Sequence, residues 1–470
     1  MRVSIIGAGP SGMTAALQLA RQGIATDVFE AGPRVGGMSS SIELWGQRVD
    51  LGPHRFFSTD PRVNRLWYDV VGDEYTLVDR QTRILYRGRF FNYPLTPANA
   101  AWNIGFREAM ACLISHWSAL GRREELDPRE VSFESWVVNR FGHRLYELFF
   151  RSYSEKLWGI PCHELSADFA AQRIRDLSLG QAMLSVLSRR HQGRHRSLAD
   201  QFPYPLAGTG SVYEAMAQEV IDRGGRIHLG QPVRRVIRQG RRSIGVELAS
   251  GESRSFDHVI STMPLTHLVE GLDDAPRSVR HAVGELRFRN TILIYLHVDS
   301  DSLFPDQWLY LHDPGLTAGR VTNFRNWSPS LYGDATTTIL AVERWCQSTD
   351  SVWSRDSDRL IRHAAEELRS TGLIGHQAIL DGHVIRLPRC YPIYRLGYRR
   401  HVEVISDYLR RIEGLSVIGR YGAFKYNNQD HGILMGILAA ENLTHGSNHD
   451  LWEVNANDFS YQERDVDVTV

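Results

Sequence analysis

The feature that most restricts the fold of this chain is a glycine pattern close to its amino terminus. A short apolar run, "VSII", precedes Gly7, Gly9 and Gly12, which have the spacing G-x-G-x-x-G. A helical pattern follows, and "ATDVFE" then forms a second strand-like run that ends at Glu30. A strand, a glycine turn, a helix and a second strand in this order predict a parallel βαβ unit that binds a dinucleotide.

Each residue type in this pattern has a physical reason. Gly7 allows a tight turn, Gly9 lets a pyrophosphate approach the backbone, and Gly12 lets the helix and the strand pack closely. The first turn of the helix offers its free N–H groups and the positive end of its dipole to phosphate. Glu30 lies 18 residues after Gly12. A carboxylate at that position accepts hydrogen bonds from ribose hydroxyls and disfavours the 2′-phosphate of NADP.

A second glycine-rich stretch, "AGPRVGGMSSS", follows directly after Glu30 and contains Arg34, Gly36 and Gly37. It resembles the second glycine motif of FAD enzymes in the superfamily of amine oxidases, protoporphyrinogen oxidases and UDP-galactopyranose mutases. Because FAD extends beyond the first turn, a second bare backbone segment is needed beside its pyrophosphate and ribityl chain. Arg34 either adds a charge-assisted bond to phosphate or is a solvated surface residue.

The resemblance implies that the cofactor is FAD and that the fold class is α/β. The expected architecture is a Rossmann-type FAD-binding domain of the glutathione-reductase-like second subgroup, with an inserted mixed α+β substrate domain. A chain of 470 residues is also too long for one hydrophobic core. The expected division is 1–90, 206–268 and 386–450 for the FAD-binding domain, 91–205 and 269–385 for the substrate domain, and 451–470 for a polar tail.

Composition limits the partners and the location. The formal net charge is zero, which gives no sign of nucleic-acid binding. The four cysteines lie far apart, without the spacing of metal ligands or of a disulfide framework, which favours the cytoplasm and predicts no metal site. The first residues begin a strand rather than a secretory signal, and no run of 18 apolar residues predicts a transmembrane span. Peripheral membrane contact and the oligomeric state stay open.

Residues 414–443 carry a second cofactor signal. They predict a strand, "LSVIG", followed by a helix of small and apolar residues, "DHGILMGILAAENL". In the FAD superfamily such a helix directs its N-terminus toward the pyrimidine end of the flavin. The resemblance implies that Gln429, Asp430 and His431 lie near the flavin N1–O2 edge, and that Val233 contacts the adenine through its backbone. The structural alternative is an ordinary buried strand–turn–helix.

Three stretches resemble UDP-galactopyranose mutases in particular: "GPHRFFSTD", "YSEKLWGIP" and "GRYGAFKYNNQD". The resemblance implies that His54 lies beside the flavin and that Arg420 touches the cofactor. It also implies that Trp158 borders the substrate pocket, that Tyr426 contacts a substrate diphosphate, and that Tyr391 of "CYPIY" lies in the same pocket. Phe424 departs from the pattern, because mutases have a tyrosine there.

Several of these side chains also have a simpler interpretation. His54, Trp158 and Tyr426 are alternatively core residues without a catalytic role. Glu155 and Lys156 are expected to form a solvated pair, and Arg55 either pairs with phosphate or stays solvated.

Two kinds of flavin chemistry compete for the function. The preferred hypothesis is an FAD-dependent oxidoreductase in which a small organic substrate loses a hydride to flavin N5. The alternative is a redox-neutral mutase of a nucleotide sugar, in which reduced FAD acts as the nucleophile and a diphosphate needs cationic and tyrosyl contacts. A non-catalytic FAD-binding scaffold is the second alternative. The expected partner is therefore a small molecule, with a nucleotide- or lipid-linked sugar among the candidates.

Overall fold

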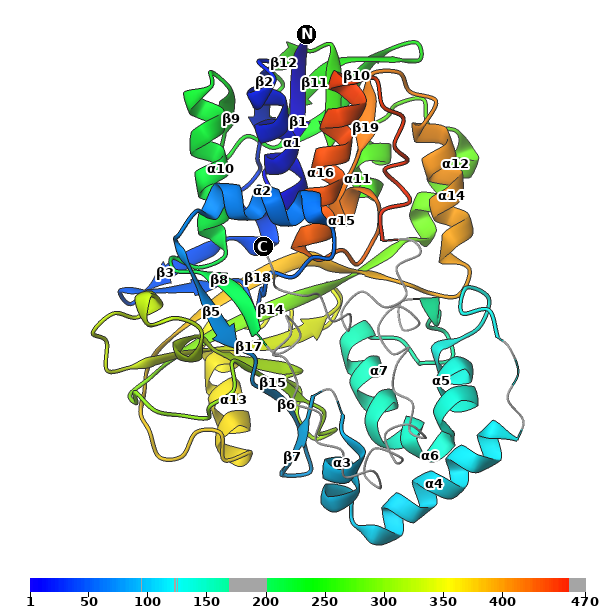
Figure 1. Cartoon of the computed structure of the whole chain (residues 1–470). Coiled ribbons are helices and arrows are strands. Elements are labelled where there is room, and N and C mark those ends of the chain that lie inside the picture. Colours follow the sequence, from blue (N-terminus) through cyan, green and yellow to red (C-terminus); the bar gives the residue numbers. More distant parts are fainter. Residues whose placement is uncertain (94, 122–123, 125, 169–200, 456–470) are drawn as a thin grey trace.

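The chain folds into two adjoining parts, one around a parallel sheet and one around a mostly antiparallel sheet (Figure 1). The computed structural model describes residues 1–93, 95–121, 124, 126–168 and 201–455. Part of the expected substrate domain, at 169–200, and most of the expected polar tail lie outside these residues.

The parallel sheet has five strands in the order β19-β13-β1-β2-β9. Its strands are β1 (Arg2–Ile6), β2 (Ala25–Phe29), β9 (Arg226–His228), β13 (His258–Ser261) and β19 (Leu415–Val417). Every neighbouring pair is parallel, and β1 lies between β2 and β13 although the latter is far away in sequence. The α/β fold class and the predicted βαβ unit are confirmed.

Side chains of β1 alternate between two covering layers, as the two-residue period of a strand requires. Val3 and Ile5 face the helices α1 (Pro10–Arg21), α10 (Gly210–Asp222) and α16 (Gln429–Thr444). Ile6 faces the opposite layer. That layer contains β10 (Val233–Gln239), β11 (Arg242–Leu248), β12 (Ser253–Ser255), α11 (Leu265–Glu270), α12 (Arg277–Glu285) and α14 (Tyr398–Leu409).

Two glycines bring α16 against α1. A Cβ atom on Gly436 would lie 2.6 Å from Ser11 O, and one on Gly432 would lie 3.1 Å from Ser11 Oγ. Larger side chains would push the two helices apart. The close approach places the N-terminus of α16 next to the N-terminus of α1, although the two are more than 400 residues apart in the sequence.

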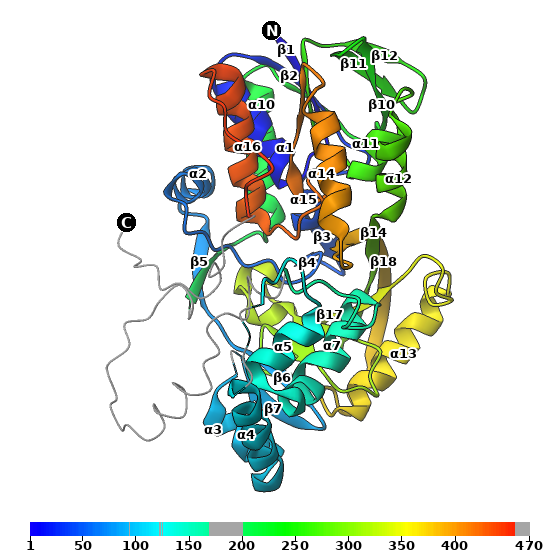
Figure 2. The same cartoon turned by 90° about the vertical axis from the view of Figure 1, so that its right-hand side faces the viewer.

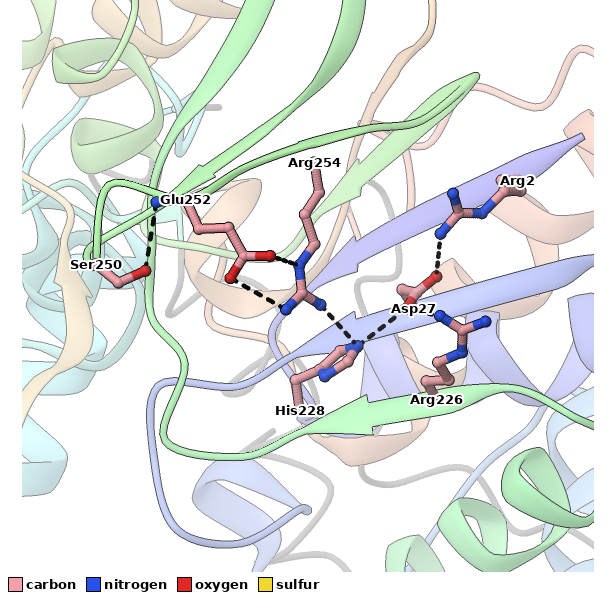
Figure 3. Close-up of polar contacts among 7 residues, drawn as sticks. All are labelled: Arg2, Asp27, Arg226, His228, Ser250, Glu252 and Arg254. Carbon is pink, nitrogen blue, oxygen red and sulfur yellow. Dashed lines mark hydrogen bonds and ion pairs between the residues drawn. The ribbon is translucent and has the colours of Figure 1, made fainter.

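A polar cluster lies between the parallel sheet and the three-stranded sheet β10–β12, as Figure 3 shows. The buried carboxylate of Asp27 on β2 is 2.9 Å from Nε2 of His228 on β9 and 3.1 Å from Nη2 of Arg2 on β1. The His228 ring stacks on Phe29 with 4.7 Å between the ring centroids. Arg254 on β12 lies with its guanidinium carbon 5.2 Å from the centroid of the same Phe29 ring, and its Nη1 lies 3.2 Å from Nε2 of His228. These contacts tie four strands together at this face.

The second sheet has seven strands in the order β18-β14-β17-β16-β15-β6-β7. They are β6 (Thr82–Tyr86), β7 (Arg89–Asn92), β14 (Arg287–Val298), β15 (Trp308–Leu311), β16 (Arg320–Asn323), β17 (Thr338–Cys346) and β18 (Ile379–Ile393). Only the pair β6–β15 is parallel. Helix α13 (Ser357–Ser370) packs on one face of this sheet.

Strands β6 and β7 form a hairpin around Gly88 and belong to the seven-stranded sheet. Strand β18 passes through residue 386 without a break. The division into two domains remains our proposal. In it, β6 and β7 are better placed with the substrate domain than with the FAD-binding domain.

The remaining elements connect these parts or cover their ends. They are α2 (Pro61–Val71), α3 (Pro97–Ile104), α4 (Phe106–Leu120), α5 (Phe133–Phe141), α6 (His143–Leu145), a π-helical segment Tyr146–Arg151, α7 (Ser152–Trp158), the hairpin β3 (Ser41–Leu44) and β4 (Gln47–Asp50), and the pair β5 (Tyr75–Asp79) and β8 (Gln201–Pro205). Short 3₁₀ turns cover Gly37–Ser39, Phe324–Asn326 and Pro329–Leu331, and a four-residue helix α15 covers Gly419–Gly422. Both views place α3 and α4 at the end of the molecule opposite the parallel sheet (Figures 1 and 2).

Candidate functional site

The first glycine turn has the geometry that the sequence pattern predicts. Gly7 follows β1 with a φ of +94°, a conformation that favours glycine. A Cβ atom on Gly12 would lie 1.9 Å from Gly7 O, so only glycine fits where α1 leaves the turn. The turn is held to β2 by a 2.8 Å hydrogen bond from Gly7 N to Phe29 O.

The second glycine stretch lies directly against the first. Gly36 N donates to Ala8 O at 2.8 Å, and a Cβ atom on Gly37 would lie 3.1 Å from Gly9 Cα. A Cβ atom on Gly9 would meet nothing closer than 3.9 Å. The two segments therefore present bare backbone beside the N-terminus of α1, and this arrangement fits the diphosphate of FAD.

Glu30 lies at the carboxyl end of β2 and closes the first turn. Its carboxylate accepts hydrogen bonds from Ala8 N at 2.8 Å and from Gly32 N at 2.7 Å. Gln231 N donates to Glu30 O at 2.9 Å, which brings the start of β10, with Val233, to the same edge. Arg34 is exposed and makes no hydrogen bond or ion pair with the described residues.

A buried carboxylate fixes the segment that carries His54. Asp50 accepts hydrogen bonds from Ser41 Oγ at 2.5 Å, Tyr204 Oη at 2.8 Å and Thr209 N at 3.1 Å. Burial raises the pKa of Asp50 despite these donors. Thr209 Oγ1 also donates to His54 O at 3.0 Å. The backbone after β4 is therefore anchored at two points.

His54 is neutral at pH 7. Burial, with the positive charges of Arg320 and Arg420, lowers its pKa to about 3. A backbone hydrogen bond with Gly52 opposes this lowering, and the Nδ1 atom is buried without a well-formed hydrogen bond among the described residues. A buried polar atom rarely lacks a partner, so Nδ1 is well suited to meet a bound ligand.

Arg55 is withdrawn from water rather than solvated. Burial, with a contribution from Arg80, lowers its pKa to about 10. Its guanidinium carbon lies 5.5 Å from the centroid of the Phe57 ring. Its Nη1 atom is buried and makes no hydrogen bond to any residue that the structure describes. Arg55 is thus a buried cation that forms no ion pair with a carboxylate in the described part of the chain.

The N-terminus of α16 lies beside this segment. The helix begins at Gln429, one residue before the predicted start, and Gln429, Asp430 and His431 are all buried. Gln429 Nε2 donates to Arg55 O at 3.1 Å, and Tyr213 Oη donates to Gln429 Oε1 at 2.9 Å. The three predicted residues therefore lie next to the His54 segment, at the positive end of a helix dipole.

Aromatic rings from three separate stretches meet in one cluster. The Trp158 ring centroid is 6.3 Å from Tyr391, 6.1 Å from Tyr394 and 5.9 Å from Tyr426. The Arg420 guanidinium lies 4.9 Å from the Tyr391 ring and 4.4 Å from the Tyr426 ring. We call these five residues the aromatic cluster. The structure brings together every residue that the mutase-like motifs proposed for the substrate pocket.

The hydrogen-bond donors of Arg420 are already used within the protein. Its guanidinium donates to Cys390 O at 2.8 and 3.0 Å and to Asn427 O at 2.8 Å. Phe424, at the position where the mutase motif has a tyrosine, is buried against the cluster. Its ring centroid lies 6.2 Å from that of Tyr394.

Sequence reasoning missed an ion pair beside His54. Arg320 on β16 and Glu343 on β17 are direct partners across the two strands, with N–O distances of 2.6 and 2.7 Å. A Cβ atom on Gly52 would lie 3.4 Å from Glu343 Oε1 and 3.9 Å from His54 Cε1. No sequence motif marks this pair, because only strand register brings the two residues together.

The expectation of a solvated Glu155–Lys156 pair is wrong for Lys156. Its Nζ donates to Leu311 O, Asp313 O and Ala318 O at 3.0, 3.0 and 3.2 Å. Burial lowers its pKa to about 8. Lys156 therefore holds the loop that leads into β16, and so acts on the strand that carries Arg320.

The described residues form neither a metal-binding group nor a membrane-spanning helix. Within the described ranges, no group of three or more His, Cys, Asp or Glu side chains is arranged to hold a metal ion. Across the same part of the chain, no helix combines the length and apolar character needed to cross a membrane.

The sequence profile of the flavin-containing amine oxidoreductases matches residues 10–379. The chain belongs to this family, and it is an FAD-dependent enzyme. Among curated relatives, the zeta-carotene desaturase of Zea mays is 25% identical over 268 residues, which are 50% of this chain and 43% of that enzyme. The matched part thus spans less than two thirds of this relative.

Solved structures with this fold include both oxidases and a mutase. A reduced UDP-galactopyranose mutase has a TM-score of 0.84 and 22% identity, with 97% of each chain covered. A putrescine oxidase bound to putrescine has a TM-score of 0.61 and 18% identity, with 95% of this chain and 99% of that chain covered. At these identities the likeness establishes the fold alone.

Proposed function

We propose that this enzyme is an oxidoreductase that removes a hydride from a small organic substrate held at the aromatic cluster. The observation that carries the proposal is that Arg320 and Arg420, the arginines at the cluster, already have partners within the protein. Glu343 neutralises Arg320, and backbone carbonyls take the donors of Arg420. The cluster therefore offers aromatic faces, phenol hydroxyls and one cation, Arg420, whose hydrogen-bond donors are already bound within the protein, which suits a largely uncharged substrate.

The cofactor is held, in this proposal, by the features at the edge of the parallel sheet. Gly7, Gly9, Gly12, Gly36 and Gly37 leave the backbone open for the diphosphate. Glu30 accepts from ribose and Val233 contacts the adenine through its backbone, while the N-terminus of α16 lies at the flavin. FAD, when bound, supplies the acceptor for the hydride.

The side chains around the cluster have separate tasks in this function. Trp158 and Tyr391 are almost fully buried and form a rigid wall that orients the substrate and excludes water. Burial and the neighbouring Tyr426 raise the pKa of Tyr391, so its hydroxyl stays protonated and acts as a hydrogen-bond donor. Nδ1 of neutral His54 is the atom available to hydrogen-bond the bound ligands.

The test uses the purified holoenzyme under anaerobic conditions with a panel of amines, unsaturated hydrocarbons and sugar nucleotides. Bleaching of the flavin absorbance by a substrate, without added reductant, is the expected result. Turnover that requires prior reduction by dithionite would overturn the proposal. Tyr391→Phe is the matched variant, because it keeps the ring and removes only the hydroxyl.

A nucleotide-sugar mutase is the second candidate function. The TM-score of 0.84 to the UDP-galactopyranose mutase, against 0.61 to the putrescine oxidase, favours it. In this function Tyr391 and Tyr426 bind the diphosphate. Arg55 adds a positive charge, because it forms no ion pair with a carboxylate of the described residues. The missing hydroxyl at Phe424 weighs against it. Interconversion of UDP-galactopyranose and UDP-galactofuranose by dithionite-reduced enzyme, and not by oxidised enzyme, would support this candidate.

A further inference from the structure

Helices α3 and α4 expose large apolar side chains instead of polar ones. Five of them are prominent: Trp102, Phe106, Ile114, Trp117 and Leu120. Trp102 is 86% exposed and Phe106 is 80% exposed, and the other three are between 43% and 60% exposed. We call these five residues the α3–α4 surface. Single exposed apolar residues are ordinary, but a group on two consecutive helices marks an interaction site.

The polarity of α4 is the reverse of that of an ordinary surface helix. At 3.6 residues per turn, Phe106, Ile114 and Trp117 lie on one side of the helix, which is the side that faces away from the protein. Cys112 and His116 are buried on the opposite side. A helix that turns a polar His inward and aromatic rings outward has its apolar face arranged for a partner rather than for water.

The described residues around this surface carry a positive charge. Residues 86–121 contain three arginines and one acidic residue, Glu108, and the exposed Glu124 follows the end of α4. Glu108 is paired with Arg144, so its charge is already neutralised. Arg87, Arg89 and Arg107 are exposed next to the apolar residues. The complementary partner is therefore both apolar and negatively charged.

These properties disfavour a second copy of the chain as the partner. A twofold dimer brings the same patch of both subunits together, so two positively charged surfaces would face each other. A membrane with anionic lipids meets both requirements, because its interface accepts tryptophan and phenylalanine while its headgroups attract arginine.

We propose that the α3–α4 surface docks on anionic membranes, with the two helices lying in the plane of the lipid headgroups. Helix α4 has 15 residues and is about 22 Å long, too short to cross a hydrocarbon core of about 30 Å. Both views place α3 and α4 at the outer end of the molecule, opposite the parallel sheet (Figures 1 and 2). Docking there leaves the cofactor-binding edge away from the lipid. This inference is independent of the reaction proposed above.

The test is co-sedimentation of the holoenzyme with vesicles of phosphatidylcholine, with or without phosphatidylserine. The wild type should bind the vesicles that contain phosphatidylserine and bind pure phosphatidylcholine weakly. The triple variant Trp102→Ser, Phe106→Ser and Trp117→Ser should bind at least about a hundredfold more weakly, because three exposed rings can no longer enter the interface. Arg107→Ala should weaken binding about fivefold, and only with phosphatidylserine present.

The matched control replaces three apolar residues that are exposed elsewhere, with Leu77→Ser, Ile221→Ser and Leu380→Ser. This control should bind as the wild type does. FAD absorbance and thermal unfolding check that each variant is folded, and the single change Trp102→Ser serves if the triple variant is not. Three results would each overturn the proposal: no sedimentation of the wild type with anionic vesicles, unchanged sedimentation of the Trp102 or triple variant, or a dimer in solution that the triple variant converts to a monomer.

Discussion

Arg320 and Glu343 form a doubly hydrogen-bonded ion pair across strands β16 and β17, with Glu343 only 2% exposed. Burial by itself would lower the pKa of Arg320, but the adjacent Glu343 carboxylate holds that pKa above its ordinary value. The charges of the pair sum to zero, but Arg320 still contributes to the low pKa of the neighbouring His54. The pair therefore sets the electrostatic character of the site.

Removing one partner of this pair should destabilise the protein strongly. Glu343→Gln leaves the Arg320 charge buried without a counter-charge, and the free energy of unfolding should fall by about 3–5 kcal/mol. Denaturant unfolding of the holoenzyme at pH 7 measures the loss. The matched control is Glu147→Gln, which removes an exposed ion pair with Arg151 and should cost less than about 1 kcal/mol. Equal losses for the two variants would show that the pair has no special role.

His54→Ala should retain FAD and slow turnover more than about tenfold, since the ligand-facing nitrogen is lost.

The same variant tests how His54 affects stability at different pH values. In the wild type the folded-state pKa of His54, about 3, lies below the value for an unfolded chain. The unfolded state therefore binds more protons between about pH 3 and 6.5, and stability falls as the pH drops through that range. The variant should lose less stability on acidification than the wild type. Steady-state kinetics and unfolding at several pH values measure both effects.

His258 is the control for this prediction. Burial lowers its pKa to about 4, and its Nε2 contacts Ser416 Oγ at 2.9 Å, within the parallel sheet. His258→Ala should also reduce the acid sensitivity, but it should leave turnover unchanged. If His54→Ala has full turnover, His54 is a core residue and the catalytic hypothesis for it fails.

Gly9→Ala tests the cofactor site without disturbing the turn. Gly9 has a φ of −75°, which any residue adopts, and an added Cβ would lie 3.9 Å from its nearest protein atom. The methyl group instead occupies the space where the diphosphate approaches the backbone. FAD affinity should fall by at least about tenfold while the far-ultraviolet circular dichroism stays the same.

Gly284→Ala is the matched control for the glycine experiment, because its added Cβ also meets nothing within 4 Å and it lies in α12. FAD titration monitored by fluorescence quenching should give the wild-type affinity for this variant. Wild-type affinity for Gly9→Ala as well would place the diphosphate elsewhere.

The parts of the fold that sequence reasoning predicted are those with local causes. Gly7 and Gly12 are required by a turn of a few residues, and Glu30 follows from the length of one strand–helix–strand unit. Such short-range patterns can be interpreted without knowing the rest of the fold. The start of α16 is similarly local and was predicted to within one residue, at Gln429.

The missed features depend on contacts between distant segments. The pairing of Arg320 with Glu343 needs the register of β16 and β17, and the carbonyls that hold Lys156 are more than 150 residues away from it. The parallel pairing of β6 with β15 was not predicted either, because strand order does not follow from periodicity.

Asp27→Asn should destabilise the cluster in Figure 3 in a way that depends on pH. Burial alone would raise the pKa of Asp27, but hydrogen bonds from His228 and Arg2 outweigh it and lower that pKa. The stabilisation by the carboxylate is therefore complete above the unfolded pKa of about 3.9, and it is lost as the pH falls through the lower folded value. Replacement by Asn should cost about 1–3 kcal/mol at pH 7 and less at acidic pH, as measured by denaturant unfolding. Asp301→Asn, at an exposed position, should change the free energy of unfolding by no more than about 0.5 kcal/mol at either pH. A loss for Asp27→Asn that is the same at pH 7 and in acid would mean that shape, and not charge, holds these strands together.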